Sequence, residues 1–496
     1  MSGLTSEYEN MTILSDLESN LRLFGQIFKN DAILRIRTVE LKNIGTKCSL
    51  LYMDGMVNTE MLNDSVVRPL VTVIAPKQEN ICDFICDKVL FAADLKKQTV
   101  IADCIRAILY GDTLLLIDNS LYALTINTKG FKTRGITEPA DERVLQGPRE
   151  GFGETAMFNL SMIRRKLLTP DLCIEMLRVG RRTETMVFIC YLGSLADKNQ
   201  VTELKKRINK IDIDGILDAN YIAENIRDHK TSLLKTTGTT ERPDIVAARM
   251  LEGRIAVVVD GTPTVLTLPY LFSENFQSDE DYYVSYLVAA VGRILRYICF
   301  FAAISVPAVF VALITFHKQL LPTSFALSVA QLRGGVPLSS FMECITLILV
   351  FEILKETGLR TPQSLGHALS IVGGLVVGQA AVEARIISAP MLIAVALSGI
   401  SGLMVPRLKG VVFYMRLILT FAAAIFGLYG YIALMSIFLI RVLSLGSFGV
   451  DYTVSLDNPK LERFKDTVLR VPWPMMKTRP AFNKNKIRIK EDCDET

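Results

Sequence analysis

Residues 297–316 read YICFFAAISVPAVFVALITF, a run of 20 residues without a formal charge. About 20 apolar residues allow a helix to cross roughly 30 Å of hydrocarbon, so this run predicts a transmembrane helix. Two further charge-free runs, 386–406 and 417–440, predict two more spans. Because three such runs are hard to bury in one globule, we predict that residues 297–440 form an α-helical multi-pass membrane domain.

Charge is distributed unevenly along the 496 residues. Only 12 of the 106 Asp, Glu, Lys and Arg residues lie in the 144 positions 297–440, and the other 352 positions carry 94. The density outside the apolar region is ordinary for water-soluble protein. The contrast excludes a wholly soluble enzyme and a disordered chain. It predicts a soluble front, a membrane domain and a short basic tail.

Two less apolar stretches, 338–354 and 364–382, lie between the charge-free runs. Glu383 and Arg385 follow the second stretch at once, which favours a re-entrant segment there over a full span. Basic residues flank both ends of the region and predict that both ends are cytoplasmic, so the number of crossings should be even. We predict four full spans plus one re-entrant segment. The basic residues between 407 and 416 also favour the cytoplasm and do not fit this count.

Ionisable side chains inside the apolar region are candidates for an ion path. A carboxylate at membrane depth costs at least about 2.5 kcal/mol and must face protein or water. Glu343 and Glu352 are nine positions apart, on opposite faces of a helix. One could face water while the other meets Lys355 or Arg360. The candidate ion-path residues are Glu343, Glu352, Gln379, Glu383 and Arg385.

Small residues recur every four positions at Gly366, Ser370, Gly374 and Gly378. On a helix they form a ridge that lets a second helix approach closely in lipid, where packing and weak polar contacts hold helices together. We interpret the ridge as a subunit packing face; a ligand-binding loop is the alternative.

The soluble front contains an internal repeat. Four residues have identical counterparts 142 positions later, within similar apolar hairpins: Gly111 and Gly253, Asp118 and Asp260, Leu124 and Leu266, Thr125 and Thr267. The pattern predicts an α/β region of two related subdomains, 31–137 and 155–270, with chance similarity as the alternative. The remaining segments are a polar lead-in (1–30), a linker loop (138–154), a pre-membrane helix (271–296) and a basic cytoplasmic tail (441–496).

The linker contains a short candidate interface loop. Its glycine and proline predict a turn before a helix. The alternative is an ordered loop that binds a neighbouring chain through its charged residues. The residues concerned are Gln146, Gly147, Pro148, Arg149 and Glu150.

Motifs for catalysis and metal binding are absent from the sequence. Three histidines lie far apart, and there is no Cys-x2-Cys pair or phosphate-binding Gly-x4-Gly-Lys-Ser/Thr loop. The net charge of +4 comes without a Lys/Arg block of the kind that binds nucleic acid. We therefore expect no catalytic residues, no cofactor, no metal and no nucleic-acid partner. The polar, acidic N-terminus lacks a signal peptide, which favours a cytoplasmic front.

Short motifs over nearly the whole chain together resemble one family. They are QGPREGF (146–152), ERPD (241–244), FQSDEDYY (276–283), RGGVP (333–337), IVGGLVVGQAA (371–381) and KTRP (477–480). With them the sequence is similar to the A subunits of the GerA-type nutrient germinant receptors of endospore-forming bacteria and their stage V sporulation AF paralogues. The family usually has Arg-Glu-Gly-Val-Pro where this chain has RGGVP, so Arg333 lacks its acidic neighbour here.

The resemblance implies an integral protein of the spore inner membrane with a cytoplasmic N-terminal region. It also implies a transporter-like B subunit and a lipoprotein C subunit as partners. A ring of A subunits, such as a pentamer, would surround a cation path that opens during nutrient-triggered germination. Three alternatives stay open: an AF-type paralogue that amplifies ion release, a small-solute or ion transporter whose mid-membrane site includes Glu383 and Arg385, and a membrane scaffold that conducts no ions.

Overall fold

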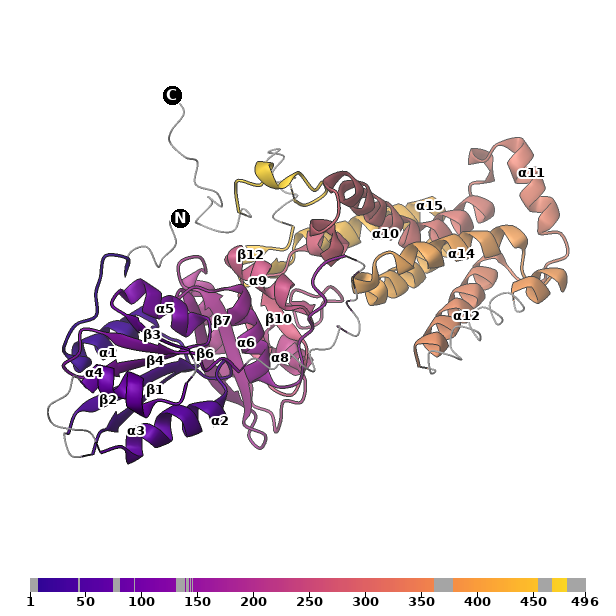
Figure 1. Ribbon diagram of the computed structural model, residues 1–496. Coiled ribbons are helices and arrows are strands. Elements are labelled where there is room, and N and C mark those ends of the chain that lie inside the picture. The colour runs from indigo at the N-terminus through magenta and orange to yellow at the C-terminus, as the bar shows by residue number, and fades with distance from the viewer. Residues whose placement is uncertain are drawn as a thin grey trace, which may run out of the picture.

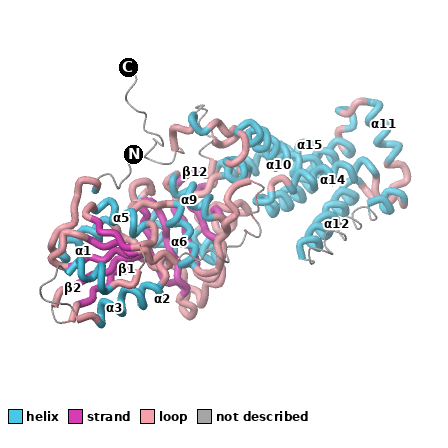
Figure 2. The backbone as a smooth tube through the Cα atoms, in the orientation of Figure 1, coloured by secondary structure: helices cyan, strands magenta, loops and turns pink. Residues whose placement is uncertain are grey.

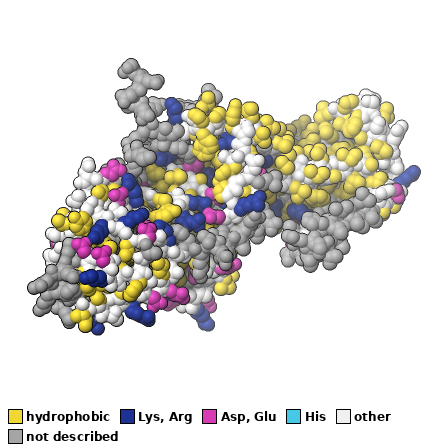
Figure 3. Space-filling model, viewed as in Figure 1, with side chains coloured by type: hydrophobic (Ala, Val, Ile, Leu, Met, Phe, Trp, Pro, Cys, Tyr) yellow, Lys and Arg dark blue, Asp and Glu magenta, His cyan; other side chains and the backbone are white. Residues whose placement is uncertain are grey.

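The computed structural model describes residues 8–42, 45–74, 81–92, 94–130, 139, 142, 144, 146–360, 378–453 and 466–479. An α/β region is followed by a helical region that extends away from it (Figure 1). The sheets lie in the first region, and long helices form the second (Figure 2). Charged side chains gather over the α/β region, whereas the visible face of the helical region is mostly hydrophobic (Figure 3). This confirms the predicted order of an α/β region and a helical region.

Each half of the α/β region contains a five-stranded antiparallel sheet. The strand orders are β1-β2-β4-β5-β3 and β6-β7-β9-β10-β8, so the second sheet repeats the first strand for strand. The prediction of two related subdomains is confirmed. The strands are β1 (Leu34–Glu40), β2 (Lys47–Met53), β3 (Leu95–Gln98), β4 (Thr113–Ile117), β5 (Ala123–Ile126), β6 (Leu172–Val179), β7 (Thr185–Leu192), β8 (Gly238–Thr240), β9 (Ile255–Val259) and β10 (Val265–Leu268).

Helices cover both faces of each sheet. One hydrophobic core is shared by the two subdomains and includes residues of α1 (Leu17–Ile27), α5 (Ile101–Leu109), α6 (Ala156–Lys166) and α9 (Pro243–Leu251). The other face of the first sheet packs on α2 (Thr59–Leu62), η2 (Asn63–Val67), α3 (Arg68–Thr72), α4 (Ile81–Phe84) and η3 (Ile85–Val89). The other face of the second sheet packs on α7 (Lys198–Asn209) and α8 (Ala219–Ile226).

The residues that are identical in the two repeats have the same structural roles. Asp118 accepts a hydrogen bond of 3.3 Å from the first backbone amide of α1, and Asp260 accepts one of 2.9 Å from the first amide of α6. Such bonds satisfy helix-terminal donors that have no partner within the helix. Gly111 and Gly253, with φ of 93° and 88°, follow α5 and α9 in the left-handed conformation that favours glycine.

A buried ion pair joins the two subdomains. The Arg164 guanidinium of α6 binds the Asp31 carboxylate, and both side chains are almost fully buried. Burial raises the pKa of Asp31 and lowers the pKa of Arg164. Beside this pair, the Ala32 amide donates to the Ile174 carbonyl of β6 at 2.9 Å, so a polar link continues from one subdomain to the other.

The helical region follows two 3-10 turns, η4 (Phe272–Phe276) and η5 (Asp279–Tyr282). The segment 271–296 thus holds these turns and the start of α10, where the sequence predicted a separate helix. The longer helices are α10 (Tyr286–Thr315), α11 (Thr323–Leu332), α12 (Ser340–Arg360), α14 (Ala389–Leu403) and α15 (Lys409–Leu443). Short turns are η6 (Lys318–Leu320), η7 (Pro406–Leu408) and η8 (Trp473–Met475). Two stretches, Tyr286–Thr315 and Pro406–Leu443, are long and apolar enough to cross a membrane.

Helix α15 consists of two arms that meet at Gly427, whose φ of 61° and ψ of −145° are not helical. Arg407, before the first arm, and Ser447, after the second, both bond to the α/β region. Gly427 instead lies against Phe316 at the far end of α10. The arms therefore run in opposite directions. The prediction of one span over 417–440 is wrong, because this glycine reverses the chain within it.

The directions of the other helices follow from their contacts. Helix α14 returns toward the α/β region, because Met391 at its start packs near Val311 and Gly402 near its end lies close to Ala303. Helix α12 runs beside α14 in the same direction, because Glu343 near its start bonds Ser388, and a Cβ atom on Gly399 would lie 2.6 Å from Phe351 further along it. The segment that joins α12 to α14 lies partly outside the described residues, so four full spans plus one re-entrant segment stays a prediction. The basic residues around Arg407 lie at the end of the bundle nearest the α/β region, where Arg407 binds Glu142 and Asp279.

Candidate functional site at the junction of the two regions

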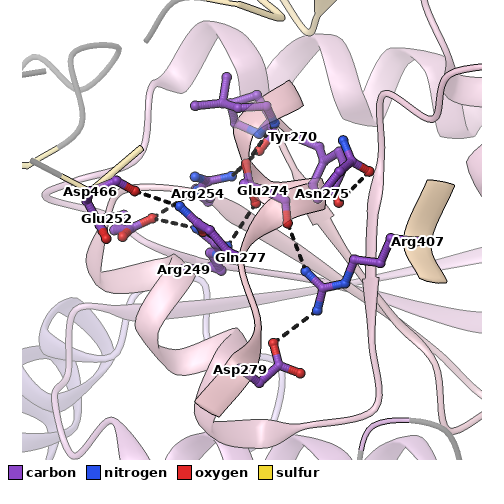
Figure 4. Close-up of polar contacts among 12 residues, drawn as sticks. Arg249, Glu252, Arg254, Tyr270, Glu274, Asn275, Gln277, Asp279, Arg407 and Asp466 are labelled. Atoms are coloured by element: carbon purple, nitrogen blue, oxygen red, sulfur yellow. Dashed lines mark hydrogen bonds and ion pairs between the residues drawn. The ribbon is translucent and has the colours of Figure 1, made fainter. Parts of the chain in front are cut away.

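A buried cluster of charged side chains lies where the second subdomain meets the start of the helices (Figure 4). The charges come from α9 and the turn after it, from η4 and η5, from the first turns of α10, from η7 and from the C-terminal segment. We call this cluster the junction network; its members are Glu142, Arg249, Glu252, Arg254, Glu274, Asp279, Asp281, Arg293, Arg296, Arg407 and Asp466.

On the subdomain side, two arginines share two carboxylates. Arg249 lies 3.3 Å from Glu252 and 3.1 Å from Glu274, and Arg254 lies 3.2 Å and 2.5 Å from the same two. None of the four side chains is more than 12% exposed. Burial alone would lower the pKa of Arg249, but Glu274 and Glu252 outweigh it and raise that pKa. Breaking such a buried pair from one side typically costs about 3–5 kcal/mol, so the group should hold one geometry.

On the helix side, Asp281 binds two arginines of α10. Arg293 Nε donates to it at 2.8 Å, and two guanidinium nitrogens of Arg296 donate at 2.9 Å each. The arginines are three positions apart and share one helix face. Burial opposes ionisation, yet the hydrogen bonds from Arg296 and Arg293 hold the pKa of Asp281 below its usual value. Arg293 also lies 2.9 Å from Asp466, which ties in the C-terminal segment.

Arg407 of η7 links the turn between α14 and α15 to the α/β region. Its guanidinium donates to Asp279 at 3.0 Å, to Glu142 at 3.4 Å and to the Glu274 carbonyl at 3.2 Å. Burial and the adjacent Asp279 carboxylate raise the pKa of Glu142, while Arg407 opposes the rise. Positive and negative groups neutralise one another across the network. Its geometry suits the transmission of movement between the second subdomain, helix α10 and the turn η7.

The end of α15 is also fastened to the second subdomain. After the second arm, β11 (Gly446–Ser447) and β12 (Val450–Asp451) form a short hairpin. At its tip, the Phe448 amide donates to Asp228 at 2.8 Å, and the ring lies 4.6 Å from the Arg207 guanidinium. The helical region thus begins and ends on the same subdomain.

Glu343, a predicted ion-path residue, is fully buried within its own chain. One carboxylate oxygen accepts from Arg333 at 3.1 Å, and the other from the Ser388 hydroxyl at 2.6 Å and amide at 3.2 Å. Arg333 therefore pairs with Glu343, ten positions later, although the RGGVP motif itself contains no acidic residue.

The other predicted ion-path residues are more exposed and are not joined into one site. Glu352 is partly exposed and lies 2.6 Å from Lys355. Gln379 donates to Glu383 at 2.9 Å on the surface. Arg385 is exposed and has a φ of 55°. Within the described residues, no hydrogen bond connects Glu352 with the group at 379–385.

The predicted packing ridge lies mostly outside the described residues. This holds for Gly366, Ser370 and Gly374. Gly378 is described, and a Cβ atom placed on it would lie 3.8 Å from Leu392 of α14. At this one position, the ridge faces a helix of the same chain.

The predicted interface loop has exposed and internally paired parts. Gln146, Gly147 and Arg149 are exposed, and Pro148 is half-buried. Glu150 lies 3.2 Å from Arg165 and 3.1 Å from Lys166, both in α6 of the same chain. Gly147 has a φ of 123° and leaves no room for a side chain, because a Cβ atom would lie 2.7 Å from the Tyr283 ring.

The family described as "Bacillus/Clostridium GerA spore germination protein" matches residues 22–482. The chain belongs to the GerA family. This GerA chain is 37% identical to spore germination protein KA of Bacillus subtilis (strain 168), over 90% of the chain and 82% of that protein. It is 33% identical to spore germination protein GerLA of Bacillus cereus, over 92% of the chain and 94% of that protein.

Two other similarities concern a membrane protein and a crystal structure. The uncharacterized membrane protein YfkQ of Bacillus subtilis (strain 168) is 37% identical over 87% of the GerA chain and 84% of its own length. The crystal structure of the N-terminal domain of the A subunit of the Bacillus megaterium spore germinant receptor GerK3 is 30% identical. It covers 53% of this chain and 97% of that one, with a TM-score of 0.42.

The sequence did not predict the junction network of this GerA chain. A signal was present, because the acidic stretch 278–281 is followed by two arginines three positions apart, Arg293 and Arg296. These arginines were interpreted only as markers of membrane orientation. The partners of Arg407 gave no local signal, since it is 265 positions from Glu142.

Proposed function

We propose that this GerA chain is the membrane subunit of a spore germination receptor and that its copies assemble around a cation path. The path would open during nutrient-triggered germination. The family match over residues 22–482 and relatives named as spore germination proteins support the germination role. Two stretches of suitable length and hydropathy support insertion into a membrane.

The observation that carries the proposal is the junction network. Arg249 and Arg254 of the second subdomain bind Glu274 of η4. The adjoining turn η5 binds α10 through Asp281 and η7 through Asp279. The chain after α15 binds the second subdomain directly through Asp228. A movement of the α/β region would therefore reach both ends of the helices at once. In the receptor, a transporter-like B subunit and a lipoprotein C subunit would supply that movement when a germinant binds.

The apolar helices would cross the spore inner membrane, with the α/β region in the cytoplasm. The cation path would then run between copies of the chain, lined by the exposed polar groups Glu352, Gln379, Glu383 and Arg385. Glu343 has both oxygens engaged by Arg333 and Ser388, so we assign it a structural role in this conformation. Oligomers, such as a pentameric ring, would bring one Glu352 from each copy near the path.

Rubidium flux into liposomes that contain the purified chain tests the path. Glu352→Gln should lower the flux at least about twofold, because a ring of carboxylates concentrates cations at a pore. Glu60→Gln, on the exposed face of α2 in the α/β region, is the matched control and should leave the flux unchanged. Wild-type flux equal to that of empty liposomes, in protein shown to be folded and inserted, would contradict the proposal.

A further inference from the structure

One backbone carbonyl in the middle of α10 has lost its helical partner. Residue 307 is proline, which has no N–H, so the carbonyl of Ala303 four positions earlier receives no hydrogen bond from its own helix. Ala303 is fully buried among helices. In a membrane no water replaces the missing donor, and another part of the protein must supply one.

Two other helices supply that donor. The Ser398 hydroxyl of α14 donates to the Ala303 carbonyl at 2.5 Å, and Arg416 Nε of the first arm of α15 donates to it at 3.0 Å. Arg416 Nη2 also donates to the Ser398 carbonyl at 3.2 Å. A single carbonyl, freed by Pro307, thus holds three helices together.

The guanidinium of Arg416 fits between these helices because of a glycine. A Cβ atom on Gly402 of α14 would lie 3.2 Å from Arg416 Nη2, closer than side chains normally approach. Arg416 is only 3% exposed. Among the described residues, no carboxylate oxygen lies within 4.0 Å of its guanidinium. The direct hydrogen bonds of this buried charge go to carbonyls, and the Glu352 carboxylate of α12 interacts with it only electrostatically, at longer range. Such a charge in a helical bundle is costly and indicates a functional role.

We propose that Arg416 is a positioning residue that locks α10, α14 and α15 in the closed arrangement of the bundle. This inference rests on the proposed function. Arg407 of the junction network precedes Arg416 by nine positions, about 13 Å along the helix, so movement of η7 acts directly on the lock. Hydrogen bonds to carbonyls can break and re-form, which allows the bundle two discrete arrangements.

A double-mutant cycle with Pro307→Ala tests the lock. Alanine at 307 restores a backbone donor for the Ala303 carbonyl, so this carbonyl no longer depends on Arg416. We expect Arg416→Met to lower the melting temperature of the purified protein by about 5 °C or more. In the Pro307→Ala background the loss should be at most half as large. Equal losses in both backgrounds would refute the lock, because Pro307 and Arg416 would then act independently.

Cation leak is the second measurement. Arg416→Met and the milder Arg416→Lys should each raise resting rubidium leak from proteoliposomes at least about threefold, whereas Arg441→Met, at the exposed end of α15, should not. If Arg416→Met fails to fold, Arg416→Lys carries both measurements. One outcome would support the lock but contradict the cation path: the melting temperatures show coupling between Pro307 and Arg416, while no variant, the wild type included, conducts rubidium. If the wild type conducts rubidium but the folded Arg416 variants show the same resting leak as the wild type, Arg416 does not hold the bundle closed.

Discussion

Asp281 shows how one residue stabilises the contact between the two regions. Its carboxylate accepts three hydrogen bonds from the two arginines that begin α10, and its side chain is 3% exposed. A carboxylate with such partners is favoured in its ionised form, which is why the pKa of Asp281 lies below its ordinary 3.8. Its stabilising effect must therefore depend on pH.

We expect Asp281→Asn to lower the free energy of unfolding by about 3 kcal/mol at pH 7, because two arginines lose a charged partner. The unfolded chain binds the Asp281 proton more tightly than the folded chain, so the stabilisation is present above pH 3.8 and is lost as the pH falls through the lower folded pKa. The difference between variant and wild type should shrink below about pH 3.8 in chemical unfolding experiments.

Asp54→Asn is the control for this prediction. Asp54 pairs with Arg35 at 3.1 Å, but its side chain is 40% exposed. Exposed pairs are worth at most about 1 kcal/mol, so this variant should stay close to wild type. A loss at Asp281 no larger than the loss at Asp54 would show that the junction is not held by this carboxylate.

In helix α15, a single glycine turns a long apolar stretch into a hairpin of two helical arms. Gly427 has a backbone conformation that other residues rarely adopt, and a Cβ atom there would lie 2.7 Å from the His317 ring. Gly430 allows the arms to approach, since a Cβ atom on it would lie 2.5 Å from the Ala422 carbonyl oxygen. The hairpin therefore depends on glycine at two nearby positions.

Gly427→Ala should lower the melting temperature of the purified protein by several degrees, about 2 kcal/mol, because alanine is strained in this conformation and collides with His317. Gly410→Ala, in the first arm of the same helix, is the matched control. A Cβ atom at Gly410 meets nothing within 4 Å, and alanine is the better helix former by about 1 kcal/mol. If Gly427→Ala melts at or above the Gly410→Ala temperature, the hairpin does not require this glycine.

The repeat in the α/β region was predictable because some of its side chains are required by local structure, such as the end of a helix. Asp118 and Asp260 cap equivalent helices, so the repeat was visible as identical residues. A further pair was missed: buried Asn20 and Asn159 each exchange two hydrogen bonds with the backbone six residues earlier. It escaped notice because its spacing is 139 positions and that of the hairpin residues is 142.

The candidate site was less predictable, because its contacts join distant parts of the chain. Arg407 meets Asp279 at a separation of 128 positions, and Arg293 meets Asp466 at 173. No periodicity or spacing in the sequence encodes such pairs. The reversal at Gly427 was hidden for a different reason, since the residues around it are as apolar as those of a continuous span.

In the whole molecule, the second subdomain lies between the first subdomain and the helices (Figure 1). It binds η4 through Arg249 and Arg254, and the chain after α15 through Asp228. The turn η5, which follows η4, binds α10 through Asp281 and η7 through Asp279. Movement of the first subdomain can reach the helices through the second subdomain and through the linker, where Glu142 binds Arg407.

Arg407→Met should leave the protein folded and inserted but reduce nutrient-triggered germination at least about tenfold, because η7 loses its ionic link to the α/β region. The measurement is the germination rate of spores that carry the variant at wild-type protein levels. Lys409→Met, two positions away and exposed, is the control and should germinate normally. Unchanged germination with Arg407→Met would show that the signal bypasses η7.

Because the two subdomains have the same fold, equivalent positions in them can be compared within one molecule. The same helix cap occurs twice in one molecule, once in a copy that carries the helices and once in a copy that does not. Arg254 of the junction network corresponds by the 142-residue offset to Asp112, which binds Lys129 at 2.9 Å, so the charge is reversed at equivalent places. Of the two similar subdomains, the second therefore uses this position to bind the turn before the helices, and the first uses it for a contact within itself.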